Sequence, residues 1–115
     1  MTHLNAFHRW TARPLGPGQF LSDLLSKVGV TQEDFADAVG TSRFSISQIV
    51  NGKRKVTMSM AFRIAKATNT SVDVWLNLQR DVDASEVYSR IEGELQKVRV
   101  VRRFRSDAEM IVEIS

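Results

Sequence analysis

The sequence predicts an all-α protein, in which five helices enclose one small core and are followed by a C-terminal helix and one or two short strands. The chain has 115 residues and a hydrophobic content of 43%, which suffices for one compact core. Apolar residues recur at three- and four-residue spacing in successive segments, each preceded by Pro, Ser or Thr. Two of these segments are separated only by a tight turn.

The first helix is expected at residues 17–28. Pro17 suits the first helical position, and Gly29 marks the end. Its apolar stripe consists of Phe20, Leu21, Leu24, Leu25 and Val28.

The central segment, residues 31–57, reads TQEDFADAVGTSRFSISQIVNGKRKVT. Thr31 is expected to cap a helix that Gly40 ends, and Ser42 to cap a second helix that stops near Asn51. The buried stripe of the second helix consists of Ile46, Ile49 and Val50. Two short helices joined by so tight a turn are typical of a DNA-binding helix-turn-helix.

The opposite face of that second helix is polar but almost uncharged. At 100° per residue, Phe44, Ser47, Gln48 and Asn51 lie roughly opposite the isoleucines. A merely solvated face usually carries Lys and Glu, whereas this one carries groups that can read base edges. Arg43 stands at its N-terminal edge, where recognition helices usually touch bases.

Positive charge is concentrated around this helix. Residues 38–72 carry six basic side chains and no acidic one, a net charge of +6, and the rest of the chain is −3. The six are Arg43, Lys53, Arg54, Lys55, Arg63 and Lys66. A local positive field suits the phosphate backbone of DNA. A solvated basic face would explain the charge but not the spacing of the turn.

Two further helices are expected, one capped by Thr57 and one opened by Ser71. Their inward-facing residues are Ala61, Ile64 and Ala65 in the first and Val72, Trp75, Leu76 and Leu78 in the second. The setting of Trp75 favours a core position over a cofactor pocket.

These residues resemble the lambda-repressor-like, Xre-type helix-turn-helix family over residues 16–79. The central segment looks like the general Xre pattern, with a Gln opening the second helix and Asn-Gly-Lys after the third. Pro17-Gly18 and MAFRIAKATNTSVDVWLNLQ at residues 60–79 resemble the HigA antitoxins within that family. Gly16 and Val72 depart from this subgroup, which commonly has His and Pro there.

The resemblance implies two groups of DNA contacts. Base contacts fall on Arg43, Phe44, Ser45, Ser47 and Gln48. Phosphate contacts fall on Gln32, Ser42, Asn51, Lys53, Arg54 and Lys55. For Phe44 an alternative stays open, in which the ring folds back onto the end of the preceding helix.

The function that the resemblance implies is that of an antitoxin of a type II toxin–antitoxin module. Such a protein binds a HigB-like mRNA-cleaving toxin and, as a homodimer on an inverted-repeat operator in double-stranded DNA, represses its own operon. The alternatives are a stand-alone Xre regulator and an enzyme or interaction protein that does not bind DNA. Catalysis is not expected, because no nucleophile elbow appears, and no metal or cofactor is expected either. His3 and His8 make a poor ligand set.

The chain lacks cysteine, which excludes disulfides, and its apolar runs are too short for a membrane span or a signal peptide. A cytoplasmic location is therefore expected. Residues 1–15 are expected to form an N-terminal arm, 16–80 the helix-turn-helix domain and 81–115 a C-terminal extension. In the extension we expect a helix at 84–96 and strands within 98–104 and 110–114. Dimerisation, toxin binding and packing on the core stay open as its role, as do flexibility and partner binding for the arm.

Overall fold

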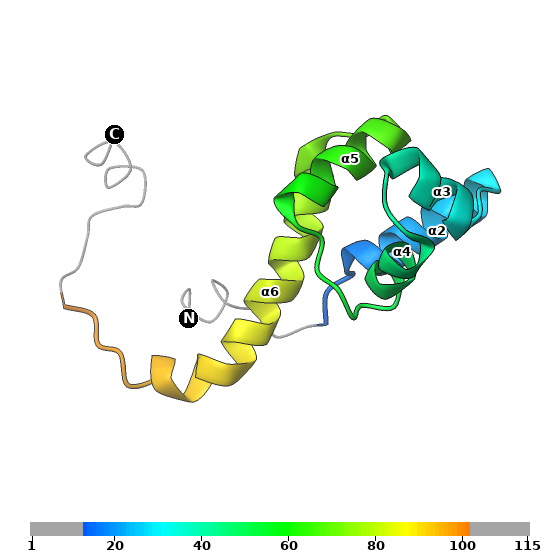
Figure 1. The fold of residues 1–115 in the computed structure, drawn as a ribbon. Helices are drawn as coiled ribbons and strands as arrows, with labels where there is room; N and C mark the ends of the chain where they lie inside the picture. Colours follow the sequence, from blue (N-terminus) through cyan, green and yellow to red (C-terminus); the bar gives the residue numbers. More distant parts are fainter. Residues whose placement is uncertain (1–12, 102–115) are drawn as a thin grey trace, which may run out of the picture.

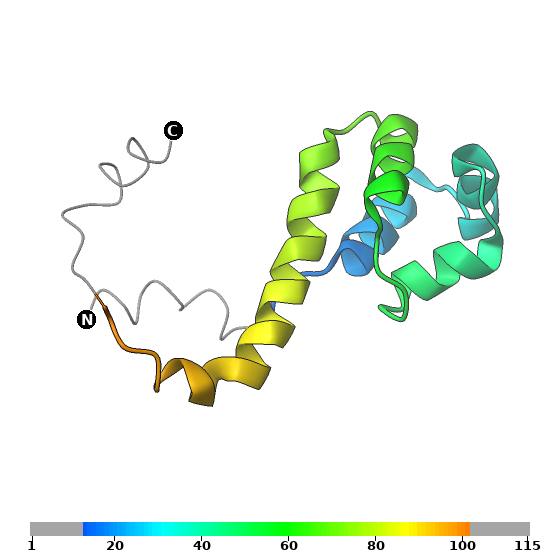
Figure 2. The same ribbon diagram turned by 60° about the vertical axis from the view of Figure 1, so that its left-hand side comes forward.

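The computed structural model describes residues 13–101, and everything said of the fold below refers to that range. Its helices are α2 (Pro17–Val28), α3 (Gln32–Val39), α4 (Arg43–Val50), α5 (Met58–Thr68) and α6 (Val72–Leu95). In Figures 1 and 2, α2 to α5 form a cluster, the first half of α6 lies along one side of it, and the second half of α6 projects away. Within the cluster, α3 and α5 pack on each other, α4 lies on α2 and α3, and α6 lies on α5 and α2. The predicted all-helical class is confirmed.

Four of the helices begin at a Ser or Thr side chain that accepts a hydrogen bond from the backbone N–H three residues later. These pairs, with N···O distances of 3.1 to 3.4 Å, are Thr31 with Asp34, Ser42 with Ser45, Thr57 with Met60, and Ser71 with Val74. α2 instead starts with Pro17 in its first turn. The predicted starts of these five helices are confirmed. Each follows from a local feature of the sequence, either a side-chain oxygen that accepts from a backbone N–H of the first turn or a proline, which has no N–H to leave unpaired.

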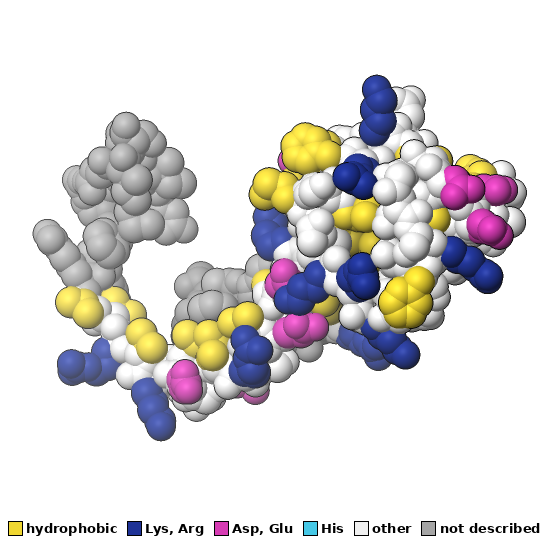
Figure 3. Space-filling model, viewed as in Figure 1, with side chains coloured by type: hydrophobic (Ala, Val, Ile, Leu, Met, Phe, Trp, Pro, Cys, Tyr) yellow, Lys and Arg dark blue, Asp and Glu magenta, His cyan; other side chains and the backbone are white. Residues whose placement is uncertain are grey.

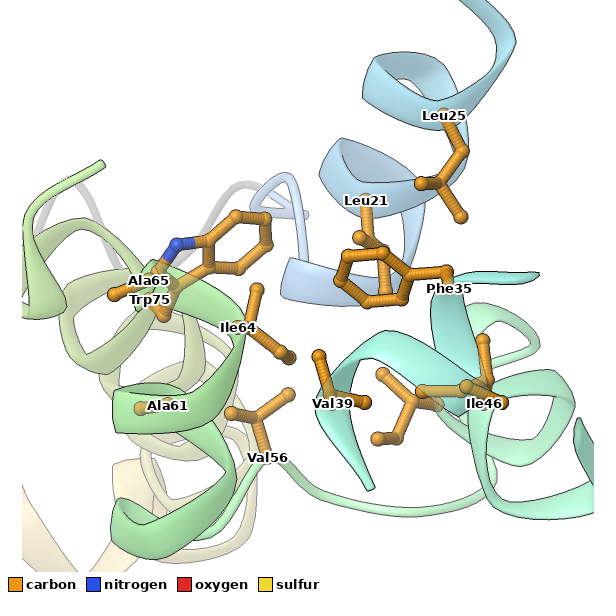
Figure 4. Close-up of a cluster of buried hydrophobic side chains, with 12 residues drawn as sticks. Leu21, Leu25, Phe35, Val39, Ile46, Val56, Ala61, Ile64, Ala65 and Trp75 are labelled. Atoms are coloured by element: carbon orange, nitrogen blue, oxygen red, sulfur yellow. The ribbon is translucent and has the colours of Figure 1, made fainter. Parts of the chain in front are cut away.

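The core lies where the five helices meet. Its largest fully buried side chains are Trp75, Leu21, Ile46, Ile49 and Ile64, and Figure 4 shows the labelled members pointing toward one another from all five helices. The Trp75 ring packs edge-on against Phe20, with ring centres 5.2 Å apart and planes at 79°. Its indole N–H donates to Thr70 Oγ1 at 2.8 Å. Trp75 is thus a core residue with a satisfied polar edge, as the sequence predicts.

The C-terminal part differs from the expectation. The predicted fifth helix and the predicted helix at 84–96 are one continuous helix, α6, because the segment between them, residues 80–83, holds neither Gly nor Pro to interrupt it. Residues 98–101 contain no strand, and Val98, Val100 and Val101 are exposed. A strand needs a hydrogen-bonding partner, and none lies among the described residues. The remainder of the expected strands and residues 1–12 of the expected arm lie outside the described range.

Among the described helices, none combines the length and the apolar character needed to cross a membrane.

Candidate nucleic-acid interface

The turn between α3 and α4 holds these two helices in a fixed relation. α3 ends at Gly40, which has φ 75° and ψ 39°, a conformation that a residue with a Cβ adopts at a cost. The N–H of Thr41 donates to the Ala36 carbonyl at 2.9 Å, and Ser42 caps α4 in the next position. Only Thr41 therefore separates the end of one helix from the cap of the next, as the sequence predicts.

Arg63 of α5 braces this turn from outside. Its Nη1 donates to the carbonyl oxygen of Gly40 at 3.2 Å and to that of Val39 at 3.4 Å. These carbonyls belong to the end of α3, where they have no partner within the helix and where a positive charge is favourable. One of the six cations of the basic segment thus stabilises the turn, a role that the sequence pattern does not reveal.

α4 has a buried and an open side. Ile46 and Ile49 are 0% and 2% exposed, and they fasten the helix to the core. Arg43 is exposed, Phe44 is 64% exposed, and Ser47 and Gln48 are partly exposed. The alternative in which Phe44 folds back against α3 is therefore not the arrangement found. Four of the five predicted base-contacting side chains are accessible on α4.

Ser45 is the exception and corrects the prediction that it faces outward. It is only 9% exposed, and its hydroxyl accepts hydrogen bonds from Ser42 Oγ at 3.1 Å and Arg54 Nη1 at 3.0 Å. The physical reason is helical spacing, since Ser45 lies one turn before the buried Ile49 and next to Ile46. Ser45 thus joins the start of α4 to the segment that follows the helix.

That segment, residues 51–57, connects α4 to α5 and is called the basic loop below. It folds back on α4, because the N–H groups of Lys53 and Arg54 both donate to the Gln48 carbonyl, at 2.8 and 3.1 Å. Asn51 Nδ2 donates to Ser47 Oγ at 3.3 Å. The backbone of the loop at Lys53 and Arg54 is consequently held against the C-terminal part of α4.

The predicted phosphate-contacting residues are distributed around that face. Ser42, Asn51, Lys53, Arg54 and Lys55 are exposed, and Gln32, at the start of α3, is partly buried. Two of the cations already have partners within the protein. Arg54 bonds to Ser45 as described, and Lys55 Nζ lies 3.0 Å from Asp83 Oδ1 of α6.

Two residues of α6 complete this site and were not predicted. The N–H of Val56 donates to Gln79 Oε1 at 2.8 Å, and Gln79 Nε2 donates to Asp83 Oδ1 at 3.0 Å. Both α6 residues therefore fasten the end of the basic loop. The only signal in the sequence is their spacing of four residues, which places them on one side of a helix but cannot say what they touch.

Basic and acidic side chains occupy different parts of the surface. Figure 3 shows Lys and Arg side chains spread over the helical cluster, whereas acidic side chains gather over α3 and along α6. Where α6 leaves the cluster, basic and acidic groups lie against each other. The positive field is local, as the sequence indicates, but α6 opposes part of it.

A short turn between two helices, an open face on the second helix and cations beside it define a helix-turn-helix DNA-binding protein. The helix-turn-helix family HTH_3 matches residues 22–75 of the chain. The HTH-type transcriptional regulator YbaQ of Escherichia coli (strain K12), itself uncharacterized, is 37% identical over 97 residues, which cover 82% of this chain and 86% of YbaQ. Antitoxin HigA-1 of Vibrio cholerae is 31% identical over 88 residues, or 76% of this chain and 83% of HigA-1.

The fold agrees with that of solved antitoxins. The Pseudomonas aeruginosa antitoxin HigA, solved with the higBA promoter, superimposes with a TM-score of 0.73 at 25% identity, covering 78% of this chain and all of that one. The chain belongs to the Xre-like helix-turn-helix family and, within it, to the HigA-type subgroup. This is a family of DNA-binding regulators and antitoxins and not one of enzymes.

Proposed function

We propose that the protein is the antitoxin of a type II toxin–antitoxin module, which neutralises a HigB-like mRNA-cleaving toxin and represses its own operon. The DNA-binding part of this proposal is supported by the open face of α4, on which Arg43 and Gln48 are accessible beside the basic loop. The similarity to HigA-1 and to a HigA that was solved with promoter DNA supports the antitoxin half.

In this proposal the protein acts in the cytoplasm as a homodimer on an inverted-repeat operator. One α4 reads only a few base pairs, so two copies about one helical turn apart supply useful specificity. Arg43, Phe44, Ser47 and Gln48 contact bases. Gln32, Ser42, Asn51, Lys53 and Arg54 contact phosphates or brace α4. Lys55 differs from this second group because of its ion pair with Asp83.

The C-terminal extension, residues 81–115, is proposed to serve dimerisation or toxin binding. It begins in the projecting half of α6, where Val87, Ile91 and Leu95 recur at helical spacing and remain partly or fully exposed. Such a stripe on a helix outside the core is suited to bury itself against another chain. The N-terminal arm is a second candidate for contact with the toxin.

A stand-alone transcriptional regulator is the second candidate function. It is favoured by the 37% identity to YbaQ, whose name is that of a transcriptional regulator and not of an antitoxin. The two functions share the DNA-binding site and differ only in the protein partner.

Operator binding is tested by fluorescence anisotropy with a duplex from the region upstream of the gene and a shuffled duplex of equal length. We expect tighter binding to the upstream duplex and a steep loss of affinity with salt for both. Equal affinity for the two duplexes would contradict sequence-specific repression.

The partner is tested by expressing the gene beside this one alone and together with the antitoxin. We expect growth arrest by the neighbouring product alone, rescue by the wild type, and a copurifying complex. A double variant, Arg43→Ala with Gln48→Ala, serves as the matched control, because it should lose operator binding and still rescue growth. Operator binding with no toxic or copurifying neighbour would select the stand-alone regulator.

A further inference from the structure

The end of the basic loop is fixed by a side chain of α6, which lies 23 residues further along the chain. Val56 is 4% exposed, so its N–H is withdrawn from water, and it donates to Gln79 Oε1 at 2.8 Å. Gln79 is itself only 9% exposed. A buried amide N–H without a partner is costly, so this bond anchors the loop to α6.

The same amide fixes a carboxylate. Because Oε1 of Gln79 faces Val56, its Nε2 must point along α6, where it donates to Asp83 Oδ1 at 3.0 Å. That oxygen lies 3.0 Å from Lys55 Nζ as well. Val56, Gln79, Asp83 and Lys55 therefore form a closed chain of contacts, which we call the loop latch.

The latch lowers the positive charge that the basic loop presents to DNA. An isolated surface ion pair is weak, and the side chains of Lys55 and Asp83 are 66% and 40% exposed. Asp83 differs from an ordinary surface carboxylate because Gln79 holds it in place. Its charge therefore stays beside the loop even when Lys55 moves, and it opposes the approach of a phosphate.

From these contacts we propose that Asp83 is a positioning residue that holds Lys55 on α6 and neutralises it, so that Lys55 adds little to DNA affinity. This inference rests on the DNA binding proposed above. Its consequence is weaker binding to DNA of any sequence. Specific recognition gains from this, because a genome offers a vast excess of non-specific sites.

The test measures binding to a random-sequence duplex over a series of salt concentrations. Five proteins are compared: the wild type, Asp83→Asn, Lys55→Met, the double variant, and Lys53→Met, which removes an exposed cation of the same loop. Asn keeps an oxygen that accepts from Gln79 Nε2 and removes only the charge. Glu92→Gln is the matched control, since Glu92 is an exposed carboxylate near the far end of the same helix.

We expect Asp83→Asn to bind the random duplex several-fold more tightly, with a slope of log K against log salt steeper by about 0.9, the value of one added phosphate contact. Lys55→Met should leave the slope near that of the wild type. The double variant should lose the gain made by Asp83→Asn, and Glu92→Gln should match the wild type. This pattern is not produced by a purely structural role, which would weaken binding in every latch variant.

Two results would overturn the inference. One is an unchanged affinity and slope for Asp83→Asn, and the other is a Lys55→Met variant whose slope falls as far as that of Lys53→Met. The second comparison does not require Asp83→Asn to fold. A wild type with no salt-dependent DNA binding would overturn the proposed function as well, whereas normal wild-type binding together with an unchanged Asp83→Asn would overturn the latch alone.

Discussion

Gly18 of α2 lies directly against the backbone carbonyl of Ile49 in α4. A Cβ at Gly18 would stand 2.1 Å from the Ile49 oxygen and 2.8 Å from the Val50 oxygen, closer than real side chains approach backbone atoms. Glycine is therefore required here by proximity and not by an unusual φ. The contact sets how closely the first turn of α2 supports the last turn of α4.

We expect Gly18→Ala to lower the free energy of unfolding by about 1–3 kcal/mol, the usual cost of overpacking, because neither backbone can yield easily. Urea denaturation measures the change. Gly93→Ala is the matched control, since Gly93 also lies within a helix but a Cβ there would meet no atom within 4 Å. Helix propensity should make that variant more stable by about 0.5–1 kcal/mol. Changes of the same sign at both positions would contradict the close approach.

Arg63 should contribute through its hydrogen bonds to the end of α3. Arg63→Met keeps most of the aliphatic stem and removes the donors to the carbonyls of Val39 and Gly40, so we expect a loss of about 1 kcal/mol in stability. Chemical denaturation of the variant and the wild type measures it. Arg80→Met is the control, because Arg80 is exposed and pairs only weakly with Asp81 at 3.5 Å. If both variants lost the same stability, the brace on the turn would be of no consequence.

Gln79 should be needed for stability because it satisfies a buried N–H. Gln79→Met matches the side chain in size but leaves the Val56 N–H without its partner, at an expected cost of about 1–3 kcal/mol. Asn77→Met, an amide-to-Met change at an exposed position of the same helix, should stay within about 0.5 kcal/mol of the wild type. Thermal unfolding monitored by circular dichroism compares the two. A Gln79→Met protein as stable as Asn77→Met would show that the bond to Val56 is dispensable.

The sequence predicts those features of the fold that depend on residues close together along the chain. Thr31 and Ser42 mark helix starts because a cap bonds three residues ahead, and Gly40 marks an end because it takes a left-handed conformation. The prediction of two separate helices after Ser71 is wrong, because no residue between them interrupts the backbone and they form the single helix α6.

The site is predictable in the same measure. The open face of α4 follows from helical geometry, so Arg43, Phe44 and Gln48 can be placed without a structure. The bond from Val56 to Gln79 joins residues 23 positions apart, and Arg54 reaches Ser45 across nine. No local pattern encodes such contacts, which is why the sequence gives Asp83 no role. Ser45 is placed among the base-facing residues by the family resemblance, although its spacing of four from Ile49 puts it on the buried side of α4.

Base-reading and phosphate-binding residues should differ in how their substitution affects DNA binding. Gln48→Ala removes an accessible side chain but leaves the Gln48 carbonyl, which accepts from Lys53 and Arg54, so the basic loop should keep its place. We expect the variant to lose about 1–3 kcal/mol of discrimination between the operator and a mutated operator while its affinity for random DNA changes little.

Lys53→Ala should behave in the opposite way. It should weaken binding to every duplex to a similar extent and lower the salt slope by about 1. Lys27→Ala, which removes an exposed cation from the last turn of α2, controls for net charge and should leave the slope unchanged. Anisotropy titrations of all three variants on operator, mutated operator and random DNA separate these outcomes. Equal losses on specific and random DNA for Gln48→Ala would mean that this side chain does not read bases, since a base contact can favour only the sequence that offers its partner.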